Sequence, residues 1–407
     1  SLLVCEGGRK AALMVKIMLK KDKSLQIFLL ISMLINISMN LAHPITPTFI
    51  KNLNLGNYMF GVAFAAMATG QFIFSPLVGK LTKSIGERKE MTAGLLLYAL
   101  GQLMFMLSKT EVMITVARLF GGASISLYTV SALTYIIRIS SEHTQGKNLT
   151  IYTMIQTVFA TFGYLIGGVI GDKSIYYAFY LQLFSLVCAA LLTYVLSIDS
   201  KEMKKEKIIF KEINPFQFLF NGKGYLTSAL VILLVVTFVA SLASTAYDQT
   251  FNYYIKDIFN FKPSHNGYIK AATGIACFIV NMTIAIKIQQ HYDLGKSLIV
   301  IFSICFMLLA AFVKIENISA VLVIAVIYFA VNSIYLPIIQ NLSVQNCSKE
   351  SRGIVVGYSN SMKSLGMIFG GLIAGFVYDL NPTYPFILAT VIFLLSAVGS
   401  FIYVRKR

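Results

Sequence analysis

Four charged side chains lie inside long apolar segments of this chain. Three are the cations Arg118, Lys270 and Lys363, and the fourth is Asp248, the one acid of 17 that we place within such a segment. A charged group inside a membrane segment usually faces a partner or a water-filled cavity, and it marks an ion or substrate pathway. A buried carboxylate could exchange a proton for a cationic substrate. The alternative for Asp248 is solvation at the outer interface, because a long apolar run precedes it.

The three cations differ in their expected surroundings. Lys363 lies near mid-depth among serines, so we expect it to line a cavity, where it could bind an anionic substrate or neutralise Asp248. Lys270 is closer to the outer edge, where it would extend its ammonium to the interface. Arg118 either faces a polar cavity or extends outward in the same way.

Uncharged polar groups also recur within apolar segments. Ser32, Asn36, Asn40 and His43 follow one another at spacings of four, four and three, which places them on one helix face. Prolines at 44 and 47 would bend that helix near its outer end. The face lines a central cavity or forms hydrogen bonds between helices, and His43 is either a second proton-coupling candidate or a structural residue. Further cavity candidates are Gln156, Asn332 and Tyr247.

The elements that position these residues follow from composition. The chain has 407 residues, of which 57% are hydrophobic and 13% charged, whereas soluble domains contain roughly 45–50% and about 25%. An all-α integral membrane protein is therefore expected. We read twelve membrane-spanning helices, each of about 20 apolar residues. They are expected at 25–50, 57–79, 91–108, 112–137, 148–171, 175–197, 225–252, 264–286, 297–313, 317–340, 354–377 and 383–404.

Positive residues fix the expected orientation. Of the 34 Lys and Arg, 25 fall in the segments on one side, six on the other, and three within spans. The richer side is cytoplasmic by the positive-inside rule, so both termini are expected in the cytoplasm. The net charge of +17 therefore reflects membrane topology, and no nucleic-acid partner is expected.

The spans divide into two sets of six. We expect a cytoplasmic N-terminal segment at 1–23, of which 1–13 need not be native, a six-helix half at 24–197, a cytoplasmic linker at 198–224 and a second half at 225–407. A shift of 207 residues aligns Thr144–Asp172 with Ser351–Asp379, and the identical residues include three glycines. Two parallel six-helix repeats are a transporter architecture that binds substrate between its halves near the bilayer midplane.

Three glycine- and arginine-containing motifs carry a family resemblance. The segment from Gly79 to Lys89 contains Gly86 and Arg88 and is expected to form a tight cytoplasmic loop. The fourth span contains Arg118–Leu119–Phe120–Gly121–Gly122. The fifth contains Gly163, Gly167 and Gly171, which share a face that permits close helix packing.

In these motifs the chain resembles the major facilitator superfamily, and within it the bacterial twelve-span drug:proton antiporters. The likeness departs from the family pattern at Lys83, where the family has an acid, and at Gly168, where it has proline. The resemblance implies a monomer in the bacterial inner membrane, in contact with lipid and with a small-molecule substrate. It also implies gating by the loop at Gly79–Lys89 and proton coupling through Arg118 and an acid of the seventh span, here Asp248.

The expected function is secondary active transport: proton-coupled efflux of amphipathic compounds by alternating access. A same-fold carrier of a sugar, peptide or metallophore is the first alternative. A membrane-embedded enzyme is disfavoured, because no acid, His or Cys pair has catalytic spacing within the spans. Five scattered Cys and four scattered His indicate no metal site. We expect no cofactor, and the absence of a phosphate-binding loop leaves the proton gradient as the energy source.

Overall fold

A computed structural model describes residues 23–140, 145–197, 227–315, 317–345 and 352–407. The expected linker at 198–224 and nearly all of the N-terminal segment lie outside this part of the chain. All regular elements in the described residues are helical. They are α2 (Lys23–Asn40), α3 (Thr46–Asn52), α4 (Met59–Ile85), α5 (Glu87–Met106), α6 (Glu111–Ile139), α7 (Gln145–Lys173), α8 (Ile175–Leu196), α10 (Ser228–Asp257), α11 (Pro263–Val280), the π-helical turn η2 (Asn281–Ala285), α12 (Ile286–His291), α13 (Leu294–Lys314), α14 (Ile318–Asn332), α15 (Tyr335–Gln345), α16 (Arg352–Leu380) and α17 (Tyr384–Lys406).

Nine helical segments within the described residues are long and apolar enough to cross a membrane. They coincide with nine of the expected spans. The other three expected spans are also helical: α2 with α3, α4, and α5. The apolar parts of α2 and α4 are shorter, and α5 begins with the charged run from Glu87 to Glu90.

Prolines interrupt two of the expected spans. A proline lacks an N–H, and its ring clashes with the carbonyl four residues earlier. Pro44 accordingly follows the end of α2 at Asn40 by four residues, and the chain turns before α3 begins. Pro337 lies five residues after the end of α14 at Asn332, and a short turn precedes α15. Non-helical backbone at membrane depth is tolerated where it is buried in protein or lines a cavity.

The expected loop between the second and third spans is much shorter than predicted. Helix α4 continues to Ile85, so Gly79 is helical, and α5 begins at Glu87. The reversal takes place at Gly86, whose φ of 90° is strained for a residue with a Cβ. Glycine at this one position therefore makes the turn.

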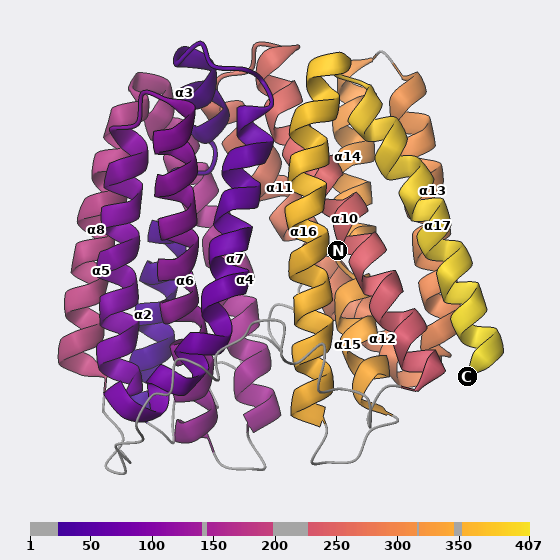
Figure 1. Cartoon of the computed structure of the whole chain (residues 1–407), viewed down its shortest axis with the longest axis horizontal. Helices are drawn as coiled ribbons and strands as arrows, with labels where there is room; N and C mark the ends of the chain where they lie inside the picture. The colour runs from indigo at the N-terminus through magenta and orange to yellow at the C-terminus, as the bar shows by residue number, and fades with distance from the viewer. Residues whose placement is uncertain (1–22, 141–144, 198–226, 316, 346–351) are drawn as a thin grey trace, which may run out of the picture.

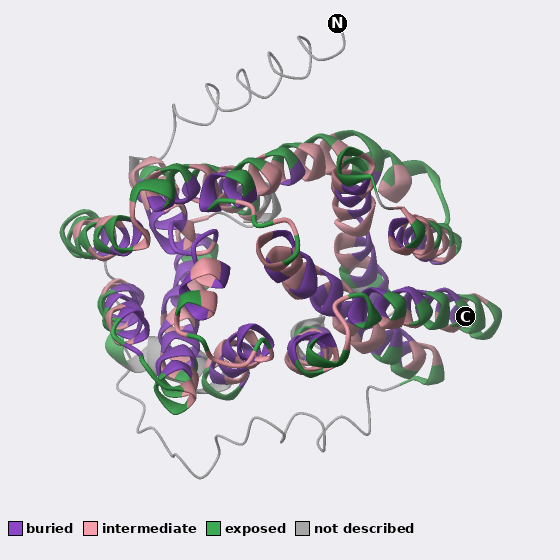
Figure 2. Ribbon diagram, turned by 90° about the horizontal axis from the view of Figure 1, so that it is seen from above, coloured by how far each residue is buried: buried purple, intermediate pink, exposed green. Residues whose placement is uncertain are grey.

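Helices α2–α8 pack mainly on one another, as do helices α10–α17. We call these the N-terminal group and the C-terminal group; Figure 1 shows them side by side, indigo to magenta and orange to yellow. The main contacts between them are α4 with α16 and α7 with α11. Buried faces turn toward the interior and exposed faces toward the periphery (Figure 2). Peripheral α8 exposes Phe184 at 69% and Val195 at 71%, as expected of a surface in contact with lipid.

Glycines paired by the 207-residue shift occupy matching places in the two groups. Gly163 of α7 packs against the backbone of α2 at Ile37, and Gly370 of α16 packs against the backbone of α10 at Leu242. A second pair from the same alignment, Gly168 and Gly375, contacts the other group instead. Gly168 meets α11, and Gly375 meets Tyr58, just before α4. Missing side chains thus permit close helix approach both within and between groups.

Candidate functional site

A cavity of about 110 Å³ lies between the two groups. Helices of both groups contribute polar and aromatic side chains to its wall. The lining residues are His43, Thr46, Pro47, Phe60, Phe64, Tyr164, Asp248, Gln249, Asn252, Tyr253 and Asn266. Two sequence-predicted proton-coupling residues, His43 and Asp248, therefore lie in one wall, although they are 205 residues apart in the chain.

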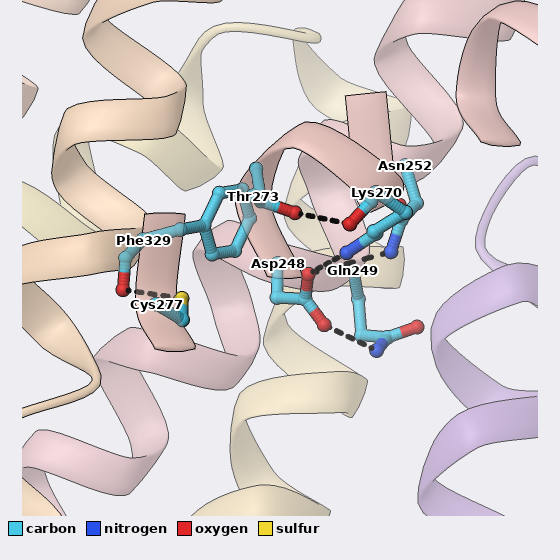
Figure 3. Close-up of polar contacts among 7 residues, drawn as sticks. All are labelled: Asp248, Gln249, Asn252, Lys270, Thr273, Cys277 and Phe329. Carbon is cyan, nitrogen blue, oxygen red and sulfur yellow. Dashed lines mark hydrogen bonds and ion pairs between the residues drawn. The ribbon is translucent and has the colours of Figure 1, made fainter. Parts of the chain in front are cut away.

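Asp248 forms an ion pair with Lys270 at this cavity. The Lys270 ammonium lies 2.5 Å from Asp248 Oδ1 and 4.8 Å from the ring centre of Phe329. Amides of Gln249 and Asn252 donate to the same carboxylate at 3.4 and 3.5 Å (Figure 3). The side chain of Lys270 is only 12% exposed, against 34% for Asp248. Lys270 therefore does not extend to the outer interface as the sequence suggested; it neutralises the carboxylate within the protein.

His43 lies in the turn between α2 and α3, which the following proline creates. Its ring is 5.4 Å from the ring of Tyr164 on α7. The carbonyl oxygen of Pro44 accepts a hydrogen bond from Asn266 of α11 at 3.4 Å. The interrupted helix thus brings a titratable ring to the cavity and offers a free carbonyl to the opposite group.

Arg118 of α6 is buried behind the cavity wall. Its side chain stacks 3.6 Å from the ring centre of Phe105 and donates to the hydroxyl of Thr46 at 3.2 Å. Thr46 itself lines the cavity. At 7% exposure Arg118 does not extend outward, and no carboxylate among the described residues forms an ion pair with it. Its positive charge is therefore met by an aromatic ring and a hydroxyl, and by no acid in this part of the chain.

Lys363 lies near the middle of α16 and is partly buried. No residue in the described ranges forms a hydrogen bond or ion pair with its ammonium. Lys270, and not Lys363, neutralises Asp248. Gln156, which the repeat pairs with Lys363, is partly buried on α7.

Three of the four residues on the predicted polar face, Ser32, Asn36 and Asn40, form hydrogen bonds within α2, while the fourth, His43, lines the cavity. Ser32 donates to the Phe28 carbonyl at 2.8 Å, and Asn36 and Asn40 each donate at 2.7 Å to the carbonyl four residues earlier. These bonds are neither the cavity contacts nor the interhelical bonds that the spacing suggested. Their effect is to satisfy polar groups inside an apolar environment.

Two further cavity candidates lie elsewhere. Tyr247 is fully buried in the aromatic core of the C-terminal group, with its ring centre 4.2 Å from that of Tyr328. Its neighbour Asp248 points to the cavity, because adjacent helical residues point about 100° apart. Asn332 ends α14 and accepts a hydrogen bond from Ser244 of α10 at 3.1 Å, so it joins two helices of the same group.

The motif glycines lie at helix contacts. Gly163 and Gly167 meet the backbone of α2 and the turn after it, and Gly171 meets side chains of Ile45 and Pro263. In the predicted gating loop, the guanidinium of Arg88 lies 5.1 Å from the ring centre of Tyr194 on α8. The glycines therefore serve helix packing. Arg88 contacts a helix of its own group.

Contacts between the two groups gather at the end of the bundle that carries α3, at the top in Figure 1. Lys51 forms an ion pair with Asp257 of the other group at 2.7 Å, and Tyr378, from the same group as Asp257, donates to that carboxylate at 3.0 Å. Tyr253 donates to Asn57 at 2.7 Å. Asp172 accepts from the backbone N–H of Ser264 at 2.9 Å. We call this the α3 end; it is closed in this structure.

Sequence reasoning missed several ion pairs and hydrogen bonds of the acids. Glu87 pairs with Arg138 at 2.9 Å and Glu90 accepts from Ser131 at 2.7 Å, so α5 and α6 are joined by two buried acids. Both acids lie in the first turn of α5, where the charged residues of the sequence suggested a solvated loop. The pairing of Lys51 with Asp257 was also missed, because it joins residues 206 positions apart.

The chain matches a family model and several known proteins. The model of the Major Facilitator Superfamily matches residues 28–364 and 297–407. Multidrug resistance protein 2 of Bacillus subtilis is 22% identical over 393 residues, which cover 96% of this chain and 97% of that protein. Quinolone resistance protein NorA of Staphylococcus aureus is 26% identical over 371 residues, covering 90% and 92%.

Solved structures show the same fold at lower identity. A bacterial homologue of the human lysosomal transporter Spinster has a TM-score of 0.74 at 11% identity and covers 95% of this chain and 98% of its own. A D-xylose-proton symporter has a TM-score of 0.70 at 14% identity and covers 92% and 96%. With the family model matching most of its length, the chain belongs to the major facilitator superfamily and is an integral membrane transporter of small molecules, not an enzyme.

Proposed function

We propose that this transporter exports amphipathic compounds in exchange for protons. The observation that carries the proposal is the ion pair of Asp248 and Lys270, in which Asp248 lines the cavity between the two helix groups. The cavity also has aromatic walls, which suit apolar ligands. Relatives that cover nearly the full chain carry the names multidrug and quinolone resistance protein, which supports efflux of drug-like compounds.

The architecture we propose has twelve membrane-spanning helices in two six-helix halves, 24–197 and 225–407, joined by a cytoplasmic linker at 198–224. In this arrangement α2 with α3, α11 with η2 and α12, and α14 with α15 each form one interrupted span. The excess of Lys and Arg supports a cytoplasmic location for both termini in a bacterial cell. The closed α3 end is then extracellular, and the protein acts as a monomer.

Proton coupling in this proposal acts through the ion pair. Protonation of Asp248 removes the negative charge that attracts the Lys270 ammonium, which lies 2.5 Å away. The freed ammonium loses its partner in a largely buried place, so the pair and the helices α10 and α11 that carry it would rearrange. His43, in the same cavity wall, is the second candidate for a proton carrier. No cofactor enters the scheme.

The test is transport by purified protein in vesicles with an imposed pH gradient, with a panel of fluorescent amphipathic compounds. Asp248→Asn keeps the shape of the side chain and removes its titration. We expect this variant to lose accumulation against a substrate gradient and to retain downhill exchange, which requires no net proton movement. Asp293→Asn is the matched control, because Asp293 lies outside the cavity as the N-cap of α13, a role that Asn also fills. Normal uphill transport by Asp248→Asn would show that the proton site lies elsewhere.

A further inference from the structure

The direction of the Lys363 side chain follows from the contacts of α16. Gly370 packs against α10, and Gly371 packs against Phe64 of α4. Lys363 precedes these glycines by seven and eight residues, so two helical turns place it in the sector between them. Phe369, Phe376 and Leu380, which are 48–78% exposed, lie about 120° away on the outer surface. Lys363 therefore faces the space between the two helix groups.

Its position along that space also follows from helix geometry. Eight residues of helix separate Lys363 from Gly371, a rise of about 12 Å. Gly371 contacts Phe64, which lines the cavity. The ammonium thus lies on the side of the cavity away from the closed α3 end. Ser359 lies one turn earlier on the same helix face and is buried.

The described charges of this region do not balance. Asp248 is neutralised by Lys270, while no described carboxylate pairs with Arg118 or with Lys363. For a cationic compound, the acid of the cavity wall, Asp248, is already paired, and the two other cations, Arg118 and Lys363, would repel it. An anionic compound would find an ammonium with three donors and no described partner. Burying a cation is unfavourable unless an opposite charge compensates it.

We propose that the transported compounds are amphipathic anions, and that Lys363 binds their carboxylate or sulfonate group. The apolar part of the compound would lie toward the aromatic wall at Phe60 and Phe64. The inference rests on the proposed transport function for the site, and it specifies the substrate class and the residue that selects it.

Three probes with one fluorophore and different charges test this directly. Dansylglycine is anionic, dansylamide neutral and dansylcadaverine cationic. Their binding to the purified full-length protein is measured by isothermal titration calorimetry, without a pH gradient. We expect the parent to bind dansylglycine at least about tenfold more tightly than dansylcadaverine. Lys363→Gln should lose about tenfold in affinity for dansylglycine with dansylamide unchanged, and Lys363→Arg should retain the parent preference.

The charge reversal Lys363→Glu makes the test sharper, because it should invert the preference in favour of dansylcadaverine. Lys314→Gln, at the end of α13 and away from the cavity, is the control and should bind as the parent does. Equal binding of dansylglycine by Lys363→Gln and the parent, a parent preference for the cation, or no binding of dansylglycine would each overturn the proposal. Binding without uphill transport would instead contradict proton-coupled efflux and leave this inference standing.

Discussion

Two levels of the interior carry charge in different ways. At the cavity, Asp248 and Lys270 form an ion pair within the C-terminal group, and at the adjoining closed α3 end Lys51 with Asp257 forms a second one between the groups. At mid-depth, Lys363 faces the space between the groups with no described partner. Asp248, Lys270 and Lys363 all belong to helices of the C-terminal group, so membership of a group does not decide whether a charge is paired.

The comparison separates charges that hold the protein together from charges left for a ligand. A paired charge contributes to the structure in which it is paired, and the loss of one partner leaves the other buried and uncompensated. An unpartnered cation contributes nothing of this kind, and it is retained at a cost in stability. The α3 end should therefore respond to substitution through stability and closure, and Lys363 through binding.

The largest effect is expected at the glycine contact that closes the α3 end. A Cβ on Gly375 would lie within 3.2 Å of three backbone atoms of Tyr58, so Gly375→Leu must separate α16 from α4. We expect transport to be abolished, and a Cys placed at Asn252 in the cavity wall to become reactive to a hydrophilic thiol reagent added from outside. Gly121→Ala should be tolerated, because its Cβ would meet Tyr98 at an ordinary 3.8 Å. Protection of the cavity Cys in Gly375→Leu would contradict this view of closure.

A smaller effect is expected from breaking the ion pair. Lys270→Met leaves the Asp248 carboxylate without its cation, which should destabilise the protein by about 1–3 kcal/mol, toward the low end because Asp248 is 34% exposed. Lys270→Met combined with Asp248→Asn removes both charges and should recover much of the loss. Thermal unfolding of the purified proteins measures both, and additive effects would show that the pair does not couple the two residues.

Much of this pair could have been predicted from the sequence. Asp248 lies nine residues before the end of α10, and Lys270 lies seven residues after the start of α11. Consecutive antiparallel helices joined by a short loop bring such positions to the same depth, so opposite charges there can meet. The apolar runs likewise predicted the helices, because hydrocarbon requires each backbone group to bond within its own segment.

Side-chain direction was harder to predict. Tyr247 and Asp248 are adjacent, and only the packing of α10 against its neighbours decides that one is core and the other lines the cavity. The α2 face was recognised as polar, yet the partners of Asn36 and Asn40 proved to be carbonyls of the same helix. A turn at one residue, Gly86, also could not be distinguished from a longer loop, because charged residues surround it.

The smallest effect on stability is expected at Lys363, and it sets the sharpest contrast with Lys270. Lys363→Met replaces the lysine with an uncharged side chain of similar length. The ammonium that it removes forms no hydrogen bond or ion pair with a described residue. The substitution also removes the desolvation cost of a partly buried ammonium. The temperature of unfolding should therefore stay unchanged or rise, whereas Lys270→Met lowers it. A loss as large as that of Lys270→Met would mean that Lys363 has a structural partner, and the division between paired and free charge would fail.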